Sequence, residues 1–215
     1  MVTKISLFNR AIGFIGGRRL HPTTGLTEAV TTRYELDAVY DSSLQYMLEQ
    51  ANWKFALRAV LIEADPDIDP GFGLAYGYSI PTDYVRMAGI STSEFFEPGL
   101  EPDFGEENGY FFASVDQFYL KYVSNHADYG LDLGLYPEHY NEALSAWMAY
   151  KSVLPISGDR GDRTDILAQH NRALAVSKRI HALSDPVKLK PSGRWTQSRG
   201  GGFQVGFRNG KMGHY

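Results

Sequence analysis

The 215-residue sequence lacks cysteine, and this absence excludes disulfide bonds, thiol catalysis and thiolate metal sites. It also lacks an apolar run near the roughly 18 residues that a membrane-spanning helix needs. Asn9 and Arg10 interrupt the apolar residues of MVTKISLFNRAIGFIGG, so we expect no secretory signal. Hydrophobic residues make up 43% of the chain, enough for the core of one domain, with or without a substantial insertion.

Acidic residues are absent from the last thirty positions. Residues 186–215 contain six Lys or Arg and seven Gly, whereas the preceding 185 residues hold 15 basic and 25 acidic residues. The chain therefore combines an acidic body with a basic C-terminal arm. This asymmetry indicates that the arm meets a partner other than its own body, or the acidic body of a neighbouring copy.

Composition leaves three interpretations of the arm open. Its high glycine content and few aliphatic residues are typical of a segment without fixed structure in the free chain. Arg199, Gly200 and Gly201 form one RGG unit near aromatic residues, which suits nucleic-acid binding, although such units normally repeat. In the third interpretation the arm orders on a protein partner, because Trp and Arg are enriched at interface anchors.

Two helices are predicted before residue 54. Apolar residues at helical spacing indicate a short helix over 5–17 that ends at a glycine pair. A longer stripe predicts the clearest helix, over 26–51. Its start is open between a capping box at 32–35 and an earlier start at 24–27.

The apolar period changes to two from residue 54 to residue 124. Alternation in this segment, with turn residues at 65–73 and 97–109, predicts four to six antiparallel strands. Residues 54–60 are also compatible with a continuation of the preceding helix.

Two more helices are predicted, over 137–154 and 164–184. Pro137 suits a first helical position, and Pro155 is expected to end the first of these helices. The polar sequence SGDRGDR, residues 157–163, is expected to form the loop between them.

The order of these elements predicts a mainly α fold with an inserted β domain, an α+β arrangement. Residues 1–53 and 135–185 are expected to form a discontinuous antiparallel helical bundle. Residues 54–134 form the inserted antiparallel β domain, and residues 186–215 form an extended C-terminal arm.

Candidates for chemistry are few. His126, Asp128 and Asp132 form the densest local group, and a histidine beside acids suits a general base or a metal ligand. We favour a polar loop instead, because a ligand set needs convergent geometry that this spacing does not imply. His170 and His181 lie about three helical turns apart, too far to hold one ion. We therefore expect no catalytic set, no metal and no cofactor.

Several motifs, in their order and spacing, resemble those of the head-to-tail adaptor proteins of short-tailed phages (podoviruses), the tail tubular protein A family. The similar stretches are LFNRAIGFIG (7–16), AVYDSSLQYMLEQANWKFALRAVLI (38–62), YGYSIPTDYVRMAGI (76–90), LYPEHYNEALSAWMAYKSVLPIS (135–157) and GRWTQSR (193–199). The residues that carry the resemblance are Asn9, Tyr40, Asp41, Trp53, Phe55, Arg58, Pro81, Asp83, Arg86 and Trp147.

The resemblance implies a structural virion protein, not an enzyme. It implies a ring of twelve copies between the portal protein and the distal tail (nozzle) protein, with a channel through which DNA passes without sequence-specific binding. It implies no membrane partner. It also implies that the arm docks on the portal, for which we expect anchoring by Arg194, Trp195, Arg199, Phe203 and Phe207. The alternative class is a nucleic-acid-binding module that uses the basic arm.

Overall fold

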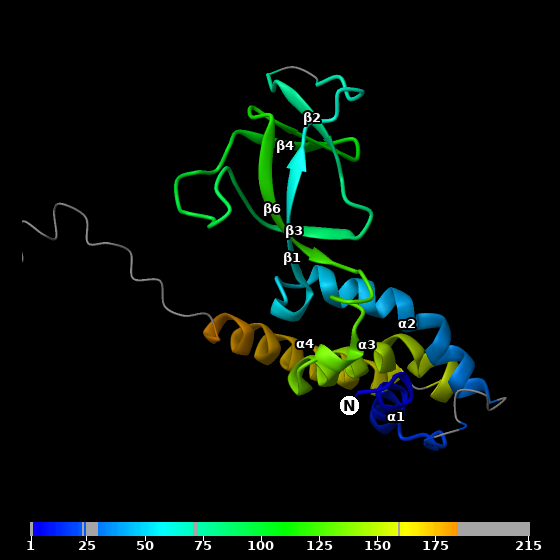
Figure 1. The fold of residues 1–215 in the computed structure, drawn as a ribbon. Helices are drawn as coiled ribbons and strands as arrows, with labels where there is room; N and C mark the ends of the chain where they lie inside the picture. Colours follow the sequence, from blue (N-terminus) through cyan, green and yellow to red (C-terminus); the bar gives the residue numbers. More distant parts are fainter. Residues whose placement is uncertain (1, 23, 25–29, 71–72, 159, 185–215) are drawn as a thin grey trace, which may run out of the picture. The chain divides into compact units, whose positions relative to one another are not determined.

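The computed structural model describes residues 2–22, 24, 30–70, 73–158 and 160–184 (Figure 1). Residues 1–182 form one compact unit, and a second unit begins at residue 183. The predicted arm lies outside the described residues. The same holds for the residues expected to anchor it, namely Arg194, Trp195, Arg199, Phe203 and Phe207.

The first helix, α1 (Lys4–Ile15), is capped at both ends. The Ser6 N–H donates to the Thr3 hydroxyl at 3.2 Å, and the Thr3 N–H donates to the Ser6 hydroxyl at 3.0 Å. Gly16 adopts the left-handed conformation with φ 80°, which the lack of a Cβ permits, and ends the helix where the sequence predicts. The helix buries Leu7, Phe8, Ala11 and Ile12.

The second helix, α2 (Thr31–Glu49), does not begin at the predicted capping box. Thr32 already belongs to the first helical turn, whereas a cap residue needs an extended backbone. Val30 occupies the cap position and offers no side-chain hydrogen bond. The earlier predicted start, at 24–27, falls largely outside the described residues. The helix buries Leu36, Tyr40, Ser43, Leu44, Met47 and Leu48.

The described part of the chain has six strands, which confirms the predicted four to six. They form two antiparallel sheets with the orders β1–β6–β3 (sheet A) and β2–β5–β4 (sheet B). A 3-10 helix, Lys54–Ala56, separates α2 from β1, so residues 54–60 do not continue the helix. The strands are β1 (Leu57–Glu63), β2 (Tyr76–Ser79), β3 (Tyr84–Ser91), β4 (Phe104–Glu107), β5 (Tyr110–Ala113) and β6 (Gln117–Ser124).

The strands enclose an apolar core of their own. Tyr78 and Phe111 from sheet B pack with Phe118, Leu120 and Tyr122 from β6 of sheet A, and all five side chains are fully buried. The residues of β6 that enter this core alternate along the strand, as the period of two predicts. The core of the helices is separate and holds most of the buried residues of α1, α2 and α3.

The third helix, α3 (Glu138–Ser157), continues past Pro155, so the prediction that this proline ends it is wrong. Pro155 lies in the last turn, where only two helical residues follow it, and little helix remains to be disturbed. Left-handed Gly158 ends the helix, and its N–H donates to the Leu154 carbonyl at 3.0 Å.

The fourth helix, α4 (Arg160–Leu183), begins four residues earlier than predicted. Residues 160–163, expected in a loop, are helical because Gly158 already completes the turn after α3. The helix buries Ile166, His170, Leu174 and Ser177.

The fold is α+β, and the prediction of a mainly α chain built on an antiparallel helical bundle is wrong. Of the described residues, 47% are helical and 20% are in strands. Both α1 and α2 pack on α3, but α1 has 12 residues whereas the other described α-helices have 19 to 24. Among the described helices, extensive contacts join α3 only to α1 and to α2, and the strands form a second core of their own.

The described strands all lie within residues 57–124. The division of the chain at residues 54, 135 and 186 stays a prediction. None of the described helices has the length and apolar content needed to cross a membrane.

Candidate functional site

Five of the motif residues meet where the chain passes between the helices and sheet A. We call this group the junction: Trp53, Phe55, Arg58, Asp83 and Arg86. They come from the link between α2 and β1, from β1 itself, and from β3 with the turn that precedes it. The sequence resemblance predicts each residue singly, and the structure shows that they share one region.

Trp53 and Phe55 pack the segment between α2 and β1 against the helical core. Trp53 is fully buried, and its indole N–H donates to the Met47 carbonyl at 2.6 Å. That carbonyl lies near the C-terminal end of α2 and also accepts from the Gln50 N–H at 3.2 Å. The rings of Trp53 and Phe55 each lie edge-on to Tyr140 of α3, with centroids 4.9 Å apart. The link is thereby held by two helices at once.

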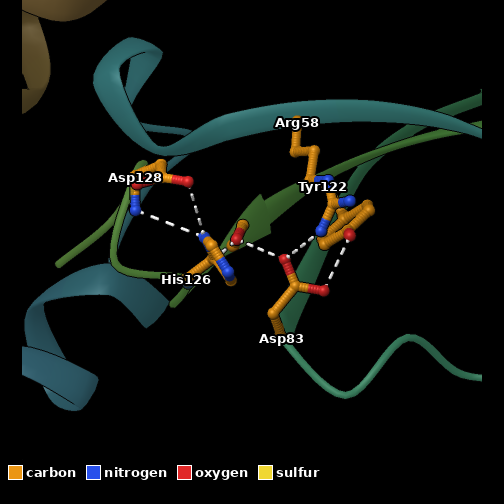
Figure 2. Close-up of polar contacts among 6 residues, drawn as sticks. Arg58, Asp83, Tyr122, His126 and Asp128 are labelled. Carbon is orange, nitrogen blue, oxygen red and sulfur yellow. Dashed lines mark hydrogen bonds and ion pairs between the residues drawn. The ribbon is translucent and has the colours of Figure 1, made fainter. Parts of the chain in front are cut away.

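Asp83 is the polar centre of the junction (Figure 2). Its carboxylate accepts hydrogen bonds from Arg58 Nη1 at 2.8 Å, Tyr122 Oη at 2.9 Å and Ser124 Oγ at 2.5 Å. Arg58 and Tyr122 are brought together by the β1–β6 register, in which they are direct partners. The Asp83 carbonyl also accepts from the Asn125 N–H at 2.9 Å. Asp83 therefore joins β1, β6 and the start of β3.

Burial and hydrogen bonding act on Asp83 in opposite directions. Burial raises the pKa of the carboxyl, but the hydrogen bonds from Ser124, Arg58 and Tyr122 outweigh it, and the pKa falls below its ordinary value. Burial, together with the bond to Asp83, raises the pKa of Tyr122 to about 12. At neutral pH the carboxylate is ionised and the phenol is protonated. A carboxylate already engaged by three donors is suited to holding strands together and poorly suited to accepting a proton from a substrate.

Arg86 links β3 to the helical region. Its guanidinium Nη1 donates to the Glu49 carbonyl at 2.9 Å, at the C-terminal end of α2. A cation there also complements the negative end of the helix dipole. Pro81 lies in the turn before β3, and its carbonyl accepts from the Tyr84 N–H at 3.0 Å. The turn thus places Asp83 and Arg86 at the same end of sheet A.

Four motif residues of the helices, namely Asn9, Tyr40, Asp41 and Trp147, do not belong to the junction. Asn9 of α1 holds the chain after that helix, because its side-chain amide exchanges two hydrogen bonds with the backbone of Leu20, at 2.7 and 3.0 Å. Trp147 of α3 stacks on Tyr46 of α2 with centroids 4.1 Å apart, and it also contacts His170 of α4.

Tyr40 and Asp41 are adjacent in α2 but face different surroundings. Tyr40 is buried edge-on against Phe8 of α1, and the Lys4 ammonium lies 4.3 Å from its ring centroid. Asp41 is exposed, and no described residue forms an ion pair with it. Asp41 is therefore available for binding, whereas Tyr40 stabilises the core.

His126, Asp128 and Asp132 do not converge on one point. His126 Nδ1 lies 3.5 Å from Asp128 Oδ2, and both residues are exposed (Figure 2). Asp132 points elsewhere and accepts from the Gly134 N–H at 2.8 Å. Across the described ranges, no three His, Cys, Asp or Glu side chains converge well enough to bind a metal ion. The polar-loop interpretation agrees with this geometry.

Tyr122 and Ser124 hydrogen-bond to Asp83 of the junction, and the sequence alone does not identify either of them. Both are fully buried, and each donates to Asp83 from a position about forty residues further along the chain. Their only signal in the sequence is the alternation of β6, which places residues 122 and 124 on the same face of the strand. Alternation does not reveal which carboxylate they meet.

No protein-family model matches the chain, and a search of curated proteins finds no relative. The resemblance to the head-to-tail adaptors accordingly stays a prediction based on the motifs.

Proposed function

We propose that this chain is a structural virion protein, a head-to-tail adaptor of a short-tailed phage. Twelve copies form a ring between the portal protein and the distal tail protein. DNA passes through the channel of the ring without sequence-specific binding, and the chain performs no catalysis and needs no cofactor. The C-terminal arm docks on the portal.

The junction is the observation that carries this proposal. Motif residues from two separated stretches of sequence, 53–58 and 83–86, meet there, and each is occupied by contacts within the chain. Arg58 and Asp83 connect strands, Arg86 connects a strand to a helix, and Trp53 connects two helices. A spacer between two binding partners needs such a fixed connection, because a force or displacement at one end has to reach the other.

The β3–β4 loop, residues 92–103, supports a contact with the distal tail protein. Phe95 in this loop is 74% exposed, more than any other strand-region apolar side chain in the described ranges. The loop carries four acidic residues and no basic residue. An exposed aromatic ring within an acidic loop suits a partner surface with an apolar pocket and basic rim.

Portal attachment of the arm is tested by co-sedimentation with purified portal rings. Trp195→Ala removes the proposed anchor, and truncation of a Trp anchor costs on the order of 2 kcal/mol, which corresponds to roughly thirtyfold weaker attachment per site. Gln204→Ala in the same arm serves as the matched control and is expected to bind as the unaltered chain does. Equal attachment of the Trp195 variant and the control would sink the anchor role.

A salt titration separates the proposal from the nucleic-acid alternative. An adaptor with an acidic body is expected to bind free DNA weakly at physiological salt. A nucleic-acid-binding module would bind the same DNA tightly, with an affinity that falls steeply as salt rises. Gel shifts of the full chain across a range of salt concentrations distinguish the two outcomes.

A further inference from the structure

Helix α4 has a second face that the fold leaves exposed, at the edge of a pocket that Arg172 and Val176 line together with Glu142 of α3. Its buried face consists of Ile166, His170, Leu174 and Ser177. On another side, Arg172, Val176, Arg179 and Ile180 are all exposed, and their spacings of three, four, seven and eight residues place them on one face. Val176 is 44% exposed and Ile180 is 39% exposed. We call these four residues the α4 face.

The α4 face is basic around its apolar centre. After Asp165 the helix carries Arg172, Lys178 and Arg179 and no acidic residue. In the described part of the chain, Arg172 and Arg179 form no ion pair. Two arginines beside exposed valine and isoleucine are a composition typical of protein interfaces, where arginine is enriched.

A groove of complementary character lies on a different part of the molecule. It has a volume of about 530 Å³ and is bounded by α2 and the segment after β6. Its apolar lining includes Leu44, Leu131 and Leu133, and Leu131 is 41% exposed. We call it the α2 groove.

The α2 groove is acidic where the α4 face is basic. Asp41 lines it and is exposed. Asp41 is the one charged residue among the described residues that line the groove, and Lys151 Nζ donates to the hydroxyl of the lining residue Ser42 at 3.1 Å. Exposed apolar side chains with opposite charges beside them meet two conditions for specific docking, namely burial of apolar area and complementary potential.

The α4 face and the α2 groove share no residue and no element, so a contact between them joins different surfaces of two copies. Such a heterologous contact leaves one free face and one free groove on every pair, and its repetition builds a ring when the rotation between neighbours closes on itself. We propose that the α4 face of one copy docks in the α2 groove of the next, with Arg179 and Arg172 directed toward Asp41. This inference rests on the proposed ring and names the surfaces that build it.

The absence of cysteine allows a direct test by site-specific crosslinking. Two single variants of the full chain, Val176→Cys and Leu131→Cys, are mixed and treated with a short bis-maleimide. The contact predicts a covalent dimer in the mixture that exceeds the dimer of either variant alone. A mixture of Val176→Cys with Phe95→Cys is the matched control, because Phe95 is more exposed than Leu131. A 176–131 yield no higher than the 176–95 yield would overturn the contact.

Charge exchange provides a second test that does not depend on the crosslinker. In the Val176→Cys and Leu131→Cys mixture, adding Arg179→Glu to the first variant or Asp41→Arg to the second is expected to lower the yield about tenfold. Combining both changes restores attraction and is expected to return most of the yield. No recovery in the combination would contradict the pairing.

Failure of this contact and failure of the proposed function are distinguishable. Rings that assemble on the portal without a 176–131 crosslink would refute the α4–α2 contact and leave the adaptor function standing. A 176–131 crosslink in a chain that does not attach to the portal would support the contact and contradict the adaptor function.

Discussion

The strand region and the interface between α3 and α4 differ in how their buried polar groups are paired. In the strand region, buried Asp83 accepts three side-chain hydrogen bonds. Between α3 and α4, by contrast, Ser145 Oγ, His170 Nε2 and Ser177 Oγ are buried and have no hydrogen-bond partner among the described residues. The first arrangement specifies one geometry, whereas the second leaves polar groups in the interface unsatisfied.

This difference indicates which of the two regions unfolds locally first. An unsatisfied buried polar group costs about 1–3 kcal/mol, so the packing of α4 on α3 contributes less to stability than its apolar area suggests. The junction, with its satisfied carboxylate, has no such deficit. We therefore expect α4 to separate locally at a lower free energy than the strands of sheet A open.

The largest expected effect is at the junction. Asp83→Ala leaves buried Tyr122 and Ser124 and the partly buried Arg58 without their acceptor, and we expect a loss of about 3 kcal/mol in the free energy of unfolding. Urea denaturation followed by circular dichroism measures it. Asp128→Ala, which removes an exposed carboxylate of the same region, is the control and is expected to change stability by less than about 0.5 kcal/mol. Equal effects of the two variants would remove the distinction between the regions.

Acid is expected to affect the helical region before the strand region. Burial of His170 lowers its pKa, and the Lys178 ammonium acts in the same direction although the bond to the Ala143 carbonyl opposes them. Because the unfolded chain then takes up the proton more readily, stability falls as pH drops below the unfolded histidine value, about 6.5. The remaining groups against the His170 ring are Tyr46 and Trp147, which are uncharged at this pH.

The Asp83 contribution has a different window. Its folded pKa is lowered, so its stabilisation is present above the unfolded aspartate value, about 3.9, and is lost as pH falls below that value. When amide hydrogen exchange is compared at pH 7 and pH 5.5, α4 should therefore lose protection at pH 5.5, whereas β1 and β6 should keep theirs. The variant His170→Phe is expected to abolish the α4 change, and loss of protection in β6 first would contradict this order.

Arg86→Ala tests how much the contact between β3 and the end of α2 stabilises the fold. It removes the hydrogen bond to the Glu49 carbonyl and the charge at the end of α2, and we expect a loss of about 1 kcal/mol because the bond is exposed. Arg86→Lys keeps the charge and is expected to recover part of it. Thermal unfolding of both variants measures the difference; a neutral Arg86→Ala would show that the link does not stabilise the fold.

The smallest effect is expected to be a gain. Ser145→Ala removes an unsatisfied buried hydroxyl and introduces the best helix former, so we expect an increase of about 0.5–1 kcal/mol. Ser152→Ala is the matched control in the same helix, since the Ser152 hydroxyl donates to the Met148 carbonyl at 2.7 Å. Its removal should bring less gain. Destabilisation by Ser145→Ala beyond that of Ser152→Ala would show that the Ser145 hydroxyl is satisfied.

Local sequence signals predicted local structure and missed what depends on distant residues. The glycine stop of α1 and the number of strands follow from spacing and turn residues. Pro155 and the start of α4 were predicted wrongly, because turn-forming residues near a helix end are compatible with helix when the following glycine completes the turn. The bundle was predicted wrongly because amphipathic stripes indicate which face is buried and not which helix covers it.

The junction shows the same limit for the candidate site. Arg58 and Asp83 were singled out by resemblance, but their contact spans 25 positions in the sequence, and the contacts of Asp83 with Tyr122 and Ser124 span 39 and 41. Register between strands decides these contacts, and no local pattern encodes it. The sequence of α4 does not identify the α4 face, because a stripe of apolar residues can belong to the core or to an interface. Only the exposure of Val176 and Ile180 in the structure distinguishes the two.

The adaptor function is tested most directly by the mass of the full chain, alone and mixed with purified portal rings, measured by native mass spectrometry. We predict that the portal gains the mass of twelve copies in a single step, because the chain binds as a closed ring. Portal rings that gain no mass, or that gain one, two or three copies without reaching a closed ring, would contradict this function.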